Sequence, residues 1–446
     1  NERDGRSQVV SRDVAEAVDG ILPGLIKIFM SGDEIVRYEP RGPEDEANCK
    51  QATDYVNWIL NQQNDGFRLF YTWFKDALLQ RTGIVKIWWD DAEKITKEVY
   101  KGLSEEQFAM LQMDESIEIT EVGVSQTAMM GTTAMTPMGP QPPTYDVTVS
   151  RTNMDGQVRI EPVPPEEFLI ERWSVDLDSA LFCAHRFRRT VSELVAKGYD
   201  REQIERAVGA DNSDFSGERA SRHWDEGQID SDQTLEDETI RYVWVAECYM
   251  KVDYDGDGFA ELRKITACGD SQYEILDNEE IDEYPFATLS PILMPHKFHG
   301  MSVADQVMDL QLLKSTLWRQ MLDNLYLANE PQRVVVNGKV NLDDMLSGGN
   351  RIIRTTDIGA VREVSVPFVA KETFPMLEYI DHVREQRTGI SDYSQGLDAN
   401  SLNKTATGIG LIQNAAVQRQ ELIARVFAET GVKRLFKLIL GLVSKY

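Results

Sequence analysis

The residues best suited to chemistry are the carboxylates of one short loop. Asp253, Asp255 and Asp257 occupy alternate positions, and Gly258 is the sixth residue of the run. Oxygen ligands at alternate positions can converge on a hard cation, while a glycine at the sixth position permits the necessary turn. Together with Glu261, these residues predict a site for a structural calcium ion.

The same loop departs from an EF-hand in two respects. Its twelfth position is Lys264, where an EF-hand carries a bidentate glutamate. The flanking residues 241–252 and 261–266 have the composition of strands rather than helices. A hairpin tip that binds a cation and a metal-free acidic turn both fit this pattern, and the sequence leaves both open.

No catalytic motif accompanies the loop. The sequence contains no nucleophile elbow, phosphate-binding loop, metalloprotease helix or dinucleotide fingerprint. Cys49, Cys183, Cys248 and Cys268 are too far apart for a zinc or redox motif, and they are interpreted as reduced core thiols. The sequence therefore predicts a protein that is not an enzyme and that requires no cofactor.

Composition and length exclude further classes of protein. The chain has 446 residues, which favours several folding units or one elongated subunit over a single compact domain. With 47 basic and 74 acidic residues, the net charge of −27 disfavours a surface that wraps nucleic acid, because such binding neutralises phosphates with Lys and Arg. No apolar run approaches the roughly 18 to 20 residues of a membrane helix, so no membrane contact is expected.

The first two thirds of the chain predict helices that lead into sheets. Apolar residues at helical spacing predict helices over 10–28, 44–61 and 67–78, with Ser11 as an N-cap and a bend or interruption at Pro23 and Gly24. The following residues read mainly as short strands, and the turn sequence at 153–156 predicts a hairpin between the strands 145–150 and 158–162. The fold class is therefore predicted to be α+β.

A pair of long helices is predicted further on. Ser302 and Asp305 resemble a capping box that begins a helix running to about Ala328, on the order of 40 Å long. A β-rich stretch over 331–367 separates it from a second helix, predicted to start at Pro375. The first helix carries apolar residues that we expect neighbouring subunits to cover: Leu310, Leu313, Leu317, Met321 and Leu325.

Several stretches, in this order, resemble the portal proteins of tailed bacteriophages, closest to the short-tailed-phage type. Two of them read Gly389-Ile390-Ser391-Asp392 and His299-Gly300-Met301-Ser302. The others are the acidic loop and residues 5–14, 73–80, 164–168, 395–397 and 402–408. The similarity extends over nearly the whole chain.

The resemblance implies an elongated portal-type subunit made of named parts. These would be a helical and β wing (1–299), two antiparallel stem helices (300–329 and 371–388), a small β-rich clip (330–370), a tunnel loop (389–404) and a bent C-terminal helix leading to a crown (405–446).

The resemblance also implies a function. Twelve subunits would form a ring at the unique capsid vertex of the virion, assembled in the host cytoplasm, through which double-stranded DNA is packaged and ejected. Expected partners are the terminase large subunit, the head-completion adaptor and tail proteins, and the capsid and scaffolding proteins. The main alternative is a calcium-responsive binding protein built on the acidic loop. A third hypothesis, an uncharacterised hydrolase, rests only on the abundance of carboxylates.

For the DNA channel, the resemblance places the polar segment 391–404 toward the ring axis. Ser401, Asn403 and Lys404 are then predicted to lie near the phosphate backbone, with Lys314 and Arg319 as further candidates on the stem. Such contacts would be few and independent of base sequence. The alternative for Lys404 is a local ion pair with a carboxylate such as Asp398.

Overall fold

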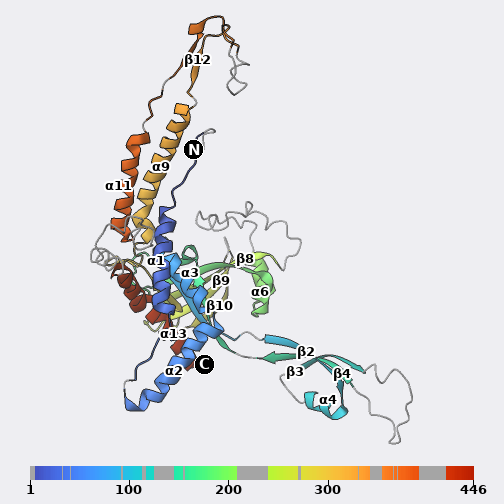
Figure 1. The fold of residues 1–446 in the computed structure, drawn as a ribbon. Coiled ribbons are helices and arrows are strands. Elements are labelled where there is room, and N and C mark those ends of the chain that lie inside the picture. Colours follow the sequence, from blue (N-terminus) through green and yellow to red (C-terminus); the bar gives the residue numbers. More distant parts are fainter. Residues whose placement is uncertain are drawn as a thin grey trace, which may run out of the picture.

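The computed structural model of the protein is elongated (Figure 1). A central body carries a long pair of helices on one side and a small sheet, termed the arm, on another. Helices and strands are mixed along the chain, which confirms the predicted α+β class. The structure describes residues 6–32, 34–40, 42–91, 94–112, 117–124, 145–153, 156–207, 240–269, 273–329, 331–341, 354–364, 366–368, 370–390 and 418–446.

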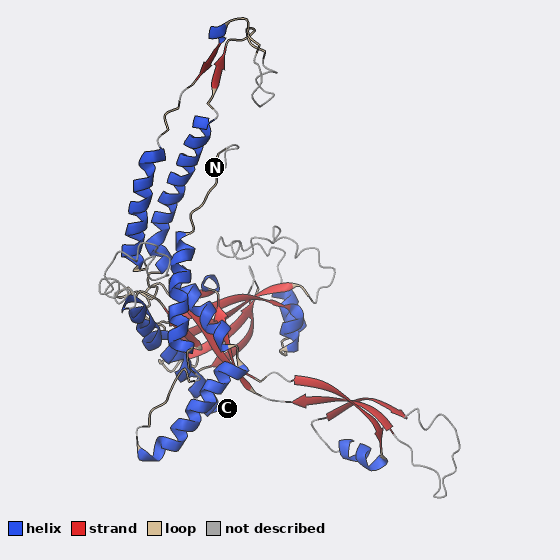
Figure 2. Ribbon diagram, in the orientation of Figure 1, coloured by secondary structure: helices blue, strands red, loops and turns tan. Residues whose placement is uncertain are grey.

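Helices and a three-stranded antiparallel sheet form the main core of the body. The strand order is β11 (Phe286–Leu289), β1 (Gly83–Asp90) and β5 (Gln157–Val163). The helices of this core are α1 (Asp13–Met30), α2 (Glu46–Trp58), α3 (Gly66–Gln80) and α13 (Lys433–Lys445). Figure 2 shows these helices gathered beside the sheets of the body.

Aromatic residues of α3 occupy the centre of this core. Phe70, Trp73 and Phe74 recur at three- and four-residue spacing and are fully buried. The ring of Phe427, from the C-terminal region, lies 5.0 Å from that of Phe74. Burial of each such side chain stabilises the fold by roughly 1.5–3 kcal/mol. The predicted helix over 67–78 is confirmed.

Two sequence predictions about α1 are wrong. The helix is not interrupted at Pro23, because the packing of buried Leu22 and Leu25 outweighs the backbone hydrogen bond that proline removes, and a bend at this position stays a prediction. Ser11 is not its N-cap, since Arg12 occupies that position without a side-chain capping bond. The Ser11 hydroxyl instead donates to the carboxylate of Asp13.

A second, five-stranded antiparallel sheet packs against the first. In order, its strands are β10 (Glu274–Glu280), β9 (Glu261–Cys268), β8 (Tyr242–Val252), β7 (Phe182–Thr190) and β6 (Phe168–Ile170). Phe286 of the first sheet meets Phe168 and Tyr249 of the second, with ring centroids 5.0 and 5.1 Å apart. The helices α6 (Val191–Ala196) and α7 (Arg201–Ala207) cover the outer end of this sheet.

The hairpin predicted around residues 153–156 is wrong, because one of its two strands belongs to the arm. The arm consists of β2 (Lys94–Leu103), α4 (Glu105–Gln112), β3 (Ile117–Val124) and β4 (Tyr145–Asn153), with the strand order β2-β4-β3. The strand β4 pairs with β2 and β3, whereas β5 pairs with β1. The two strands that were expected to form one hairpin therefore belong to different sheets.

The long helical pair consists of α9 (Val303–Asn329) and α11 (Ala370–Thr388). At its far end lie the short antiparallel strands β12 (Arg333–Val335) and β13 (Val361–Glu363) (Figure 2). The predicted helix from about Gly300 to Ala328 is confirmed. The second helix begins five residues before Pro375, so the proline lies inside the helix rather than in its first turn.

The expectation that neighbouring subunits cover the apolar face of α9 is wrong for Leu310 and Met321 and stays a prediction for the other residues. Leu310 and Met321 are 7% and 8% exposed, so the single chain already buries them. Leu317 and Leu325 are half-buried, and Leu313 is 43% exposed. Leu312, next to Leu313 in the sequence, was not among the predicted residues and is more exposed, at 64%.

The predicted capping box at the start of α9 is confirmed. The Ser302 hydroxyl accepts a hydrogen bond from the Asp305 amide at 2.9 Å, and the Ser302 amide donates to the Asp305 carboxylate at 3.0 Å. The Arg81 guanidinium donates two hydrogen bonds to the same carboxylate, at 2.8 and 2.9 Å. These contacts attach the start of α9 to the end of α3.

This arrangement predicts how acid affects the base of α9. Hydrogen bonds from Arg81, followed by those from Ser302, lower the pKa of Asp305 from its ordinary value of 3.8 to about 2. Since the folded-state value lies below the ordinary one, the stabilising contribution is complete above about pH 4 and is lost as the pH falls through 2. In acid titrations followed by thermal unfolding, Arg81→Met should flatten the loss of stability between pH 4 and pH 2, and an unchanged slope would contradict the contribution of this pair.

Candidate functional site

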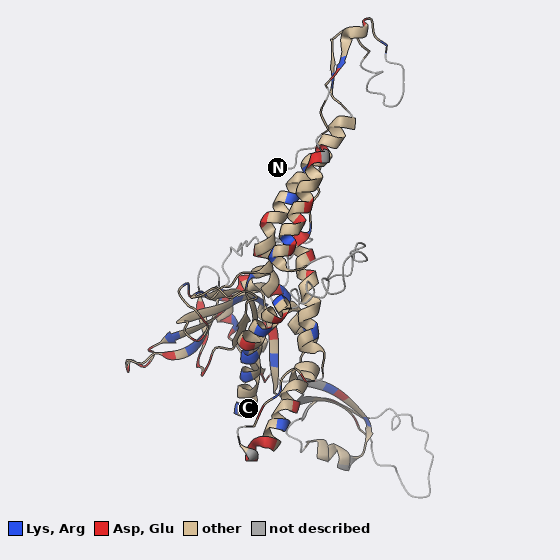
Figure 3. Cartoon of the chain, turned by 60° about the vertical axis from the view of Figure 1, so that its left-hand side comes forward, with Lys and Arg blue, Asp and Glu red and all other residues tan. Residues whose placement is uncertain are grey.

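A cluster of five charged side chains joins α1 to both long helices. Its members are Asp13 and Glu16 from α1, Lys314 from α9, and Asp381 and Arg384 from α11. The Lys314 ammonium lies 2.8 Å from the Asp13 carboxylate and 2.6 Å from that of Asp381. The Arg384 guanidinium lies 3.0 Å from Asp13 and 2.8 Å from Glu16. Figure 3 shows acidic and basic residues close together along this hairpin.

Asp13 is the centre of the cluster, since both cations contact it and it is only 1% exposed. Burial by itself would raise the pKa of Asp13. Hydrogen bonds from Lys314 and Ser11, with the charges of Lys314 and Arg384, outweigh that effect and lower the pKa below its ordinary value. The carboxylate therefore stays charged. The cluster holds α1 against the helical hairpin formed by α9 and α11, and so fixes the direction in which this pair extends from the body.

The face of α9 that adjoins α1 also holds the N-terminal segment, which runs beside the helix (Figure 1). Side chains four residues apart share one helical face. Four of them contact the backbone of residues 7–14: Gln311 and Ser315 accept from the amides of Val14 and Ser11, Arg319 donates to the Val9 carbonyl, and Asp323 accepts from the Ser7 amide. The segment is thus attached through its main chain, which leaves Val9 and Val10 exposed.

The structure places two of the five predicted DNA-channel residues. Lys314 is a member of the charge cluster, and the exposed Arg319 donates at 2.8 Å to the carbonyl oxygen of Val9. Ser401, Asn403 and Lys404 lie outside the described residues. Assignment of these residues to the DNA path stays a prediction.

The acidic loop connects β8 to β9 as a hairpin turn. Carboxylate oxygens of Asp253, Asp255 and Asp257 lie within 4.8 Å of one another, and all three residues are exposed. Glu261 is not a member of this group, and its carboxylate instead lies 3.0 Å from the Arg263 guanidinium. Of the four carboxylates predicted from sequence spacing, the structure therefore brings three together.

The backbone of this loop holds the same carboxylates in place. The Asp253 carboxylate accepts hydrogen bonds from the amides of Gly256 and Gly258 at 2.7 and 3.0 Å. Both glycines have positive φ angles, 80° and 89°, which residues with a Cβ rarely adopt. These bonds stabilise the turn without an ion, so the loop geometry fits both a cation site and a metal-free turn.

Calcium dependence separates these two interpretations. If the loop binds calcium, an ion concentration about 100 times the dissociation constant stabilises the fold by about 2.7 kcal/mol, and Asp255→Ala should abolish that gain while leaving stability in chelator unchanged. Differential scanning calorimetry with and without calcium measures both quantities. The control Glu280→Ala, on the exposed end of β10, should retain the full gain. If calcium has no effect on the stability of the unsubstituted protein, the cation site is excluded and the loop is a metal-free turn.

A comparison with known families tests the resemblance directly. The family model described as phage SU10 portal protein matches residues 1–446, the full length of the sequence. The match takes in the body, the arm, the helical hairpin and the C-terminal helix together, and it supports the short-tailed-phage type predicted from the sequence. The chain therefore belongs to the phage SU10 portal protein family.

Proposed function

We propose that twelve copies of this chain form a ring at the unique capsid vertex and act as the conduit for double-stranded DNA during packaging and ejection. Membership in the portal family makes the chain a structural component of the virion at the head-to-tail connection. The observation that carries the proposal is the family match over the whole chain. In this role the ring catalyses nothing itself, and a terminase motor supplies ATP hydrolysis.

The parts of the subunit are assigned accordingly. Residues 1–299 form the wing, 300–329 and 371–388 the stem, 330–370 the clip, 389–404 the tunnel loop, and 405–446 the bent helix toward the crown. The antiparallel course of α9 and α11, with two short strands at the far end, supports the assignment of stem and clip. The segments 391–404 and 405–417 lie outside the described residues.

The clip is proposed as the docking surface, first for the terminase large subunit and later for adaptor and tail proteins. Its described residues include exposed apolar side chains, with Ile358 95%, Val334 59% and Val336 49% exposed. Exposed apolar groups at a projecting tip favour protein partners. A symmetric ring presents this surface in identical copies around one axis, which suits successive partners. Capsid and scaffolding proteins are the proposed neighbours of the wing, and assembly takes place in the host cytoplasm.

Images of the purified protein test the proposal. Negative-stain electron microscopy should show rings with a central hole, viewed along the axis. Monodisperse monomers at the concentrations used for assembly would contradict the conduit. They would favour a protein whose behaviour depends on the acidic loop, and the calcium measurements above test that alternative.

Lys404 tests the DNA path within this proposal. Lys404→Glu should leave rings intact while lowering the amount of packaged DNA or its retention severalfold, because one cation near the phosphate backbone is replaced by an anion. The effect should be the same for any DNA sequence, since phosphate contacts carry no base information. Measurement requires virions that carry the substitution, with Lys101→Glu on the exposed arm as control. Normal packaging, retention and ejection would remove Lys404 from the DNA path.

A further inference from the structure

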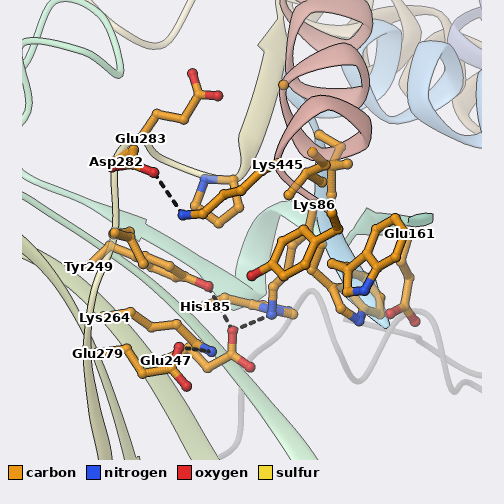
Figure 4. Close-up of a pocket in the computed structure, with 18 of the residues that line it drawn as sticks. Lys86, Glu161, His185, Glu247, Tyr249, Lys264, Glu279, Asp282, Glu283 and Lys445 are labelled. Atoms are coloured by element: carbon orange, nitrogen blue, oxygen red, sulfur yellow. Dashed lines mark hydrogen bonds and ion pairs between the residues drawn. The ribbon is translucent and has the colours of Figure 1, made fainter. Parts of the chain in front are cut away.

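A cavity of about 700 Å³ lies between the two sheets of the body, beside the end of α13 (Figure 4). Lys86 and Trp88 line it from β1, while β7, β8 and β9 supply the facing wall. At the rim, the ring of Tyr446 stacks on Trp89, with centroids 5.0 Å apart and planes within 10°. A space of this size and aromatic character suits a small organic molecule.

The floor of the cavity carries a buried ion pair. The Lys86 ammonium contacts the Glu247 carboxylate, and the Tyr249 hydroxyl donates to the same carboxylate at 2.9 Å. The ammonium also lies 5.3 Å from the centroid of the Trp88 ring and 5.6 Å from that of Phe187. Apolar residues of similar size often stabilise a core as well as a buried ion pair does, so stability alone does not explain this pair.

Three of the carboxylates around the cavity already have cationic partners. The pairs are Lys86 with Glu247, Lys264 with Glu279 at 3.4 Å, and Lys445 with Asp282 at 2.8 Å. Two further carboxylates, Glu161 and Glu283, belong to exposed residues that water can solvate. The acceptors at this site are therefore satisfied by the protein or by solvent.

Hydrogen-bond donors at the same site lack acceptors. An ammonium can donate three hydrogen bonds, and among the described residues Lys86 has one carboxylate acceptor, Glu247. The Nδ1 atom of His185 and the Nε atom of Arg189 are buried without a partner in the described part of the chain. The other nitrogens of these side chains are engaged, since the Arg189 guanidinium lies 3.7 Å from Glu193 and Nε2 of His185 lies 3.6 Å from Glu167. His185, Phe187 and Arg189 alternate along β7, so all three face the cavity. The Nε–H of Arg189 and the remaining N–H groups of Lys86 are donors, whereas Nδ1 of His185 donates only in the tautomer or charge state that places a hydrogen on it. An unmet buried donor destabilises the protein unless a ligand or water accepts from it.

The electrostatics of the floor agree with this excess of donors. Burial is the largest influence on Lys86 and lowers its pKa, and the positive charges of Lys264 and Lys197 act in the same direction against Glu247. Burial would raise the pKa of Glu247, but Lys86, Lys264 and His185 outweigh it and lower the pKa to about 2. Lys264 and Lys197 therefore place positive charge beside the ion pair, in a lining whose cations and carboxylates are equal in number, and an oxyanion next to these cations would be stabilised.

We propose that this cavity binds a small flat molecule carrying one oxyanion, a carboxylate or a phosphate, with the oxyanion beside Lys86, His185 and Arg189. The unmet donors supply the contacts to the oxyanion, while Trp88 and Phe187 pack against the flat body of the ligand. The cavity lining includes none of the residues proposed for the DNA path, so the proposal does not depend on their assignment.

Binding to the intact purified protein tests the proposal. The probes are benzoate, deoxyadenosine monophosphate and inorganic phosphate, each titrated by isothermal calorimetry. At least one aromatic anion should bind saturably with one site per chain, and more tightly than inorganic phosphate. Binding of benzoate alone would identify the carboxylate as the preferred oxyanion, and binding of the nucleotide alone would identify the phosphate. No saturable binding of either aromatic anion would overturn the proposal.

Substitutions on β7 locate the bound anion. Arg189→Leu should weaken binding at least about tenfold, because it removes a charged donor from the cavity. The control Arg188→Leu alters the opposite face of the strand, where Arg188 lies 4.8 Å from the Trp244 ring, and should leave affinity unchanged. The paired change Lys86→Met and Glu247→Gln removes both buried charges together and should also abolish binding. Equal effects of the two arginine substitutions, or full binding by the paired variant, would refute this site.

Discussion

Asp13→Leu is expected to lower the free energy of unfolding by about 3 kcal/mol, because it removes the buried carboxylate that both Lys314 and Arg384 contact. The two cations have side chains only 13% and 16% exposed, so water cannot fully replace the lost partner. Asp381 and Glu16 remain beside them, which keeps the expected loss at the low end of the usual range for a broken buried ion pair.

A matched control is available on the same helix. Asp19 lies 4.0 Å from Lys75, and its side chain is 65% exposed, so Asp19→Leu should cost less than about 1 kcal/mol. Urea unfolding followed by circular dichroism in the far ultraviolet measures both variants. The cluster hypothesis requires a clear difference between them. Similar losses for Asp13→Leu and Asp19→Leu would show that burial adds nothing to this charge cluster.

Features encoded by neighbouring residues could be predicted from the sequence. The capping box at Ser302 and the aromatic spacing of α3 depend on side chains three or four positions apart, and both were found as expected. The convergence of three aspartates in the β8–β9 loop depends on alternation over five residues. In each case, the residues that form the sequence pattern are also the residues that contact one another in the structure.

Features decided by distant partners could not be predicted in this way. The turn signal at 153–156 suits a hairpin, but β5 instead pairs with β1, about seventy residues earlier in the chain. Proline at positions 23 and 375 normally ends or begins a helix, yet in both places tertiary packing keeps the helix continuous. In these places, contacts with distant residues outweigh the local preference for a turn or a helix end, and a single sequence does not reveal such contacts.

The charge cluster illustrates the same limit for the candidate site. Asp13 and Lys314 are separated by 301 positions, and neither lies in a recognisable motif. From the sequence, Lys314 was a basic residue on a long helix and was therefore considered for DNA contact. A charged residue at the start of one helix, and an acidic residue three positions before a basic one on another helix, are too common to have indicated the pairing.

Exposed apolar side chains on the helical hairpin point to contact between subunits. On α9, Leu312 and Leu313 are 64% and 43% exposed, and on α11 Met376 and Tyr379 are 47% and 67% exposed. Two helices packed against each other leave their outer faces open in a single chain, and a ring brings such faces of neighbouring copies together. The exposed rows on the two helices are therefore expected to become buried on assembly.

The double substitution Leu312→Asp and Leu313→Asp should prevent ring formation while leaving the subunit folded. Each new carboxylate would be removed from water at every subunit contact without a partner, at a cost of at least about 1–3 kcal/mol per group. The cost recurs at each interface of a closed ring, so even a modest penalty per contact shifts the equilibrium toward monomers. Native mass spectrometry measures the distribution of assemblies. Val99→Asp, which changes a residue 61% exposed on the arm, is the matched control and should leave rings intact. Rings that persist with both leucines replaced would mean that this part of α9 faces solvent in the assembly, and the contact between subunits would then have to be sought on the body.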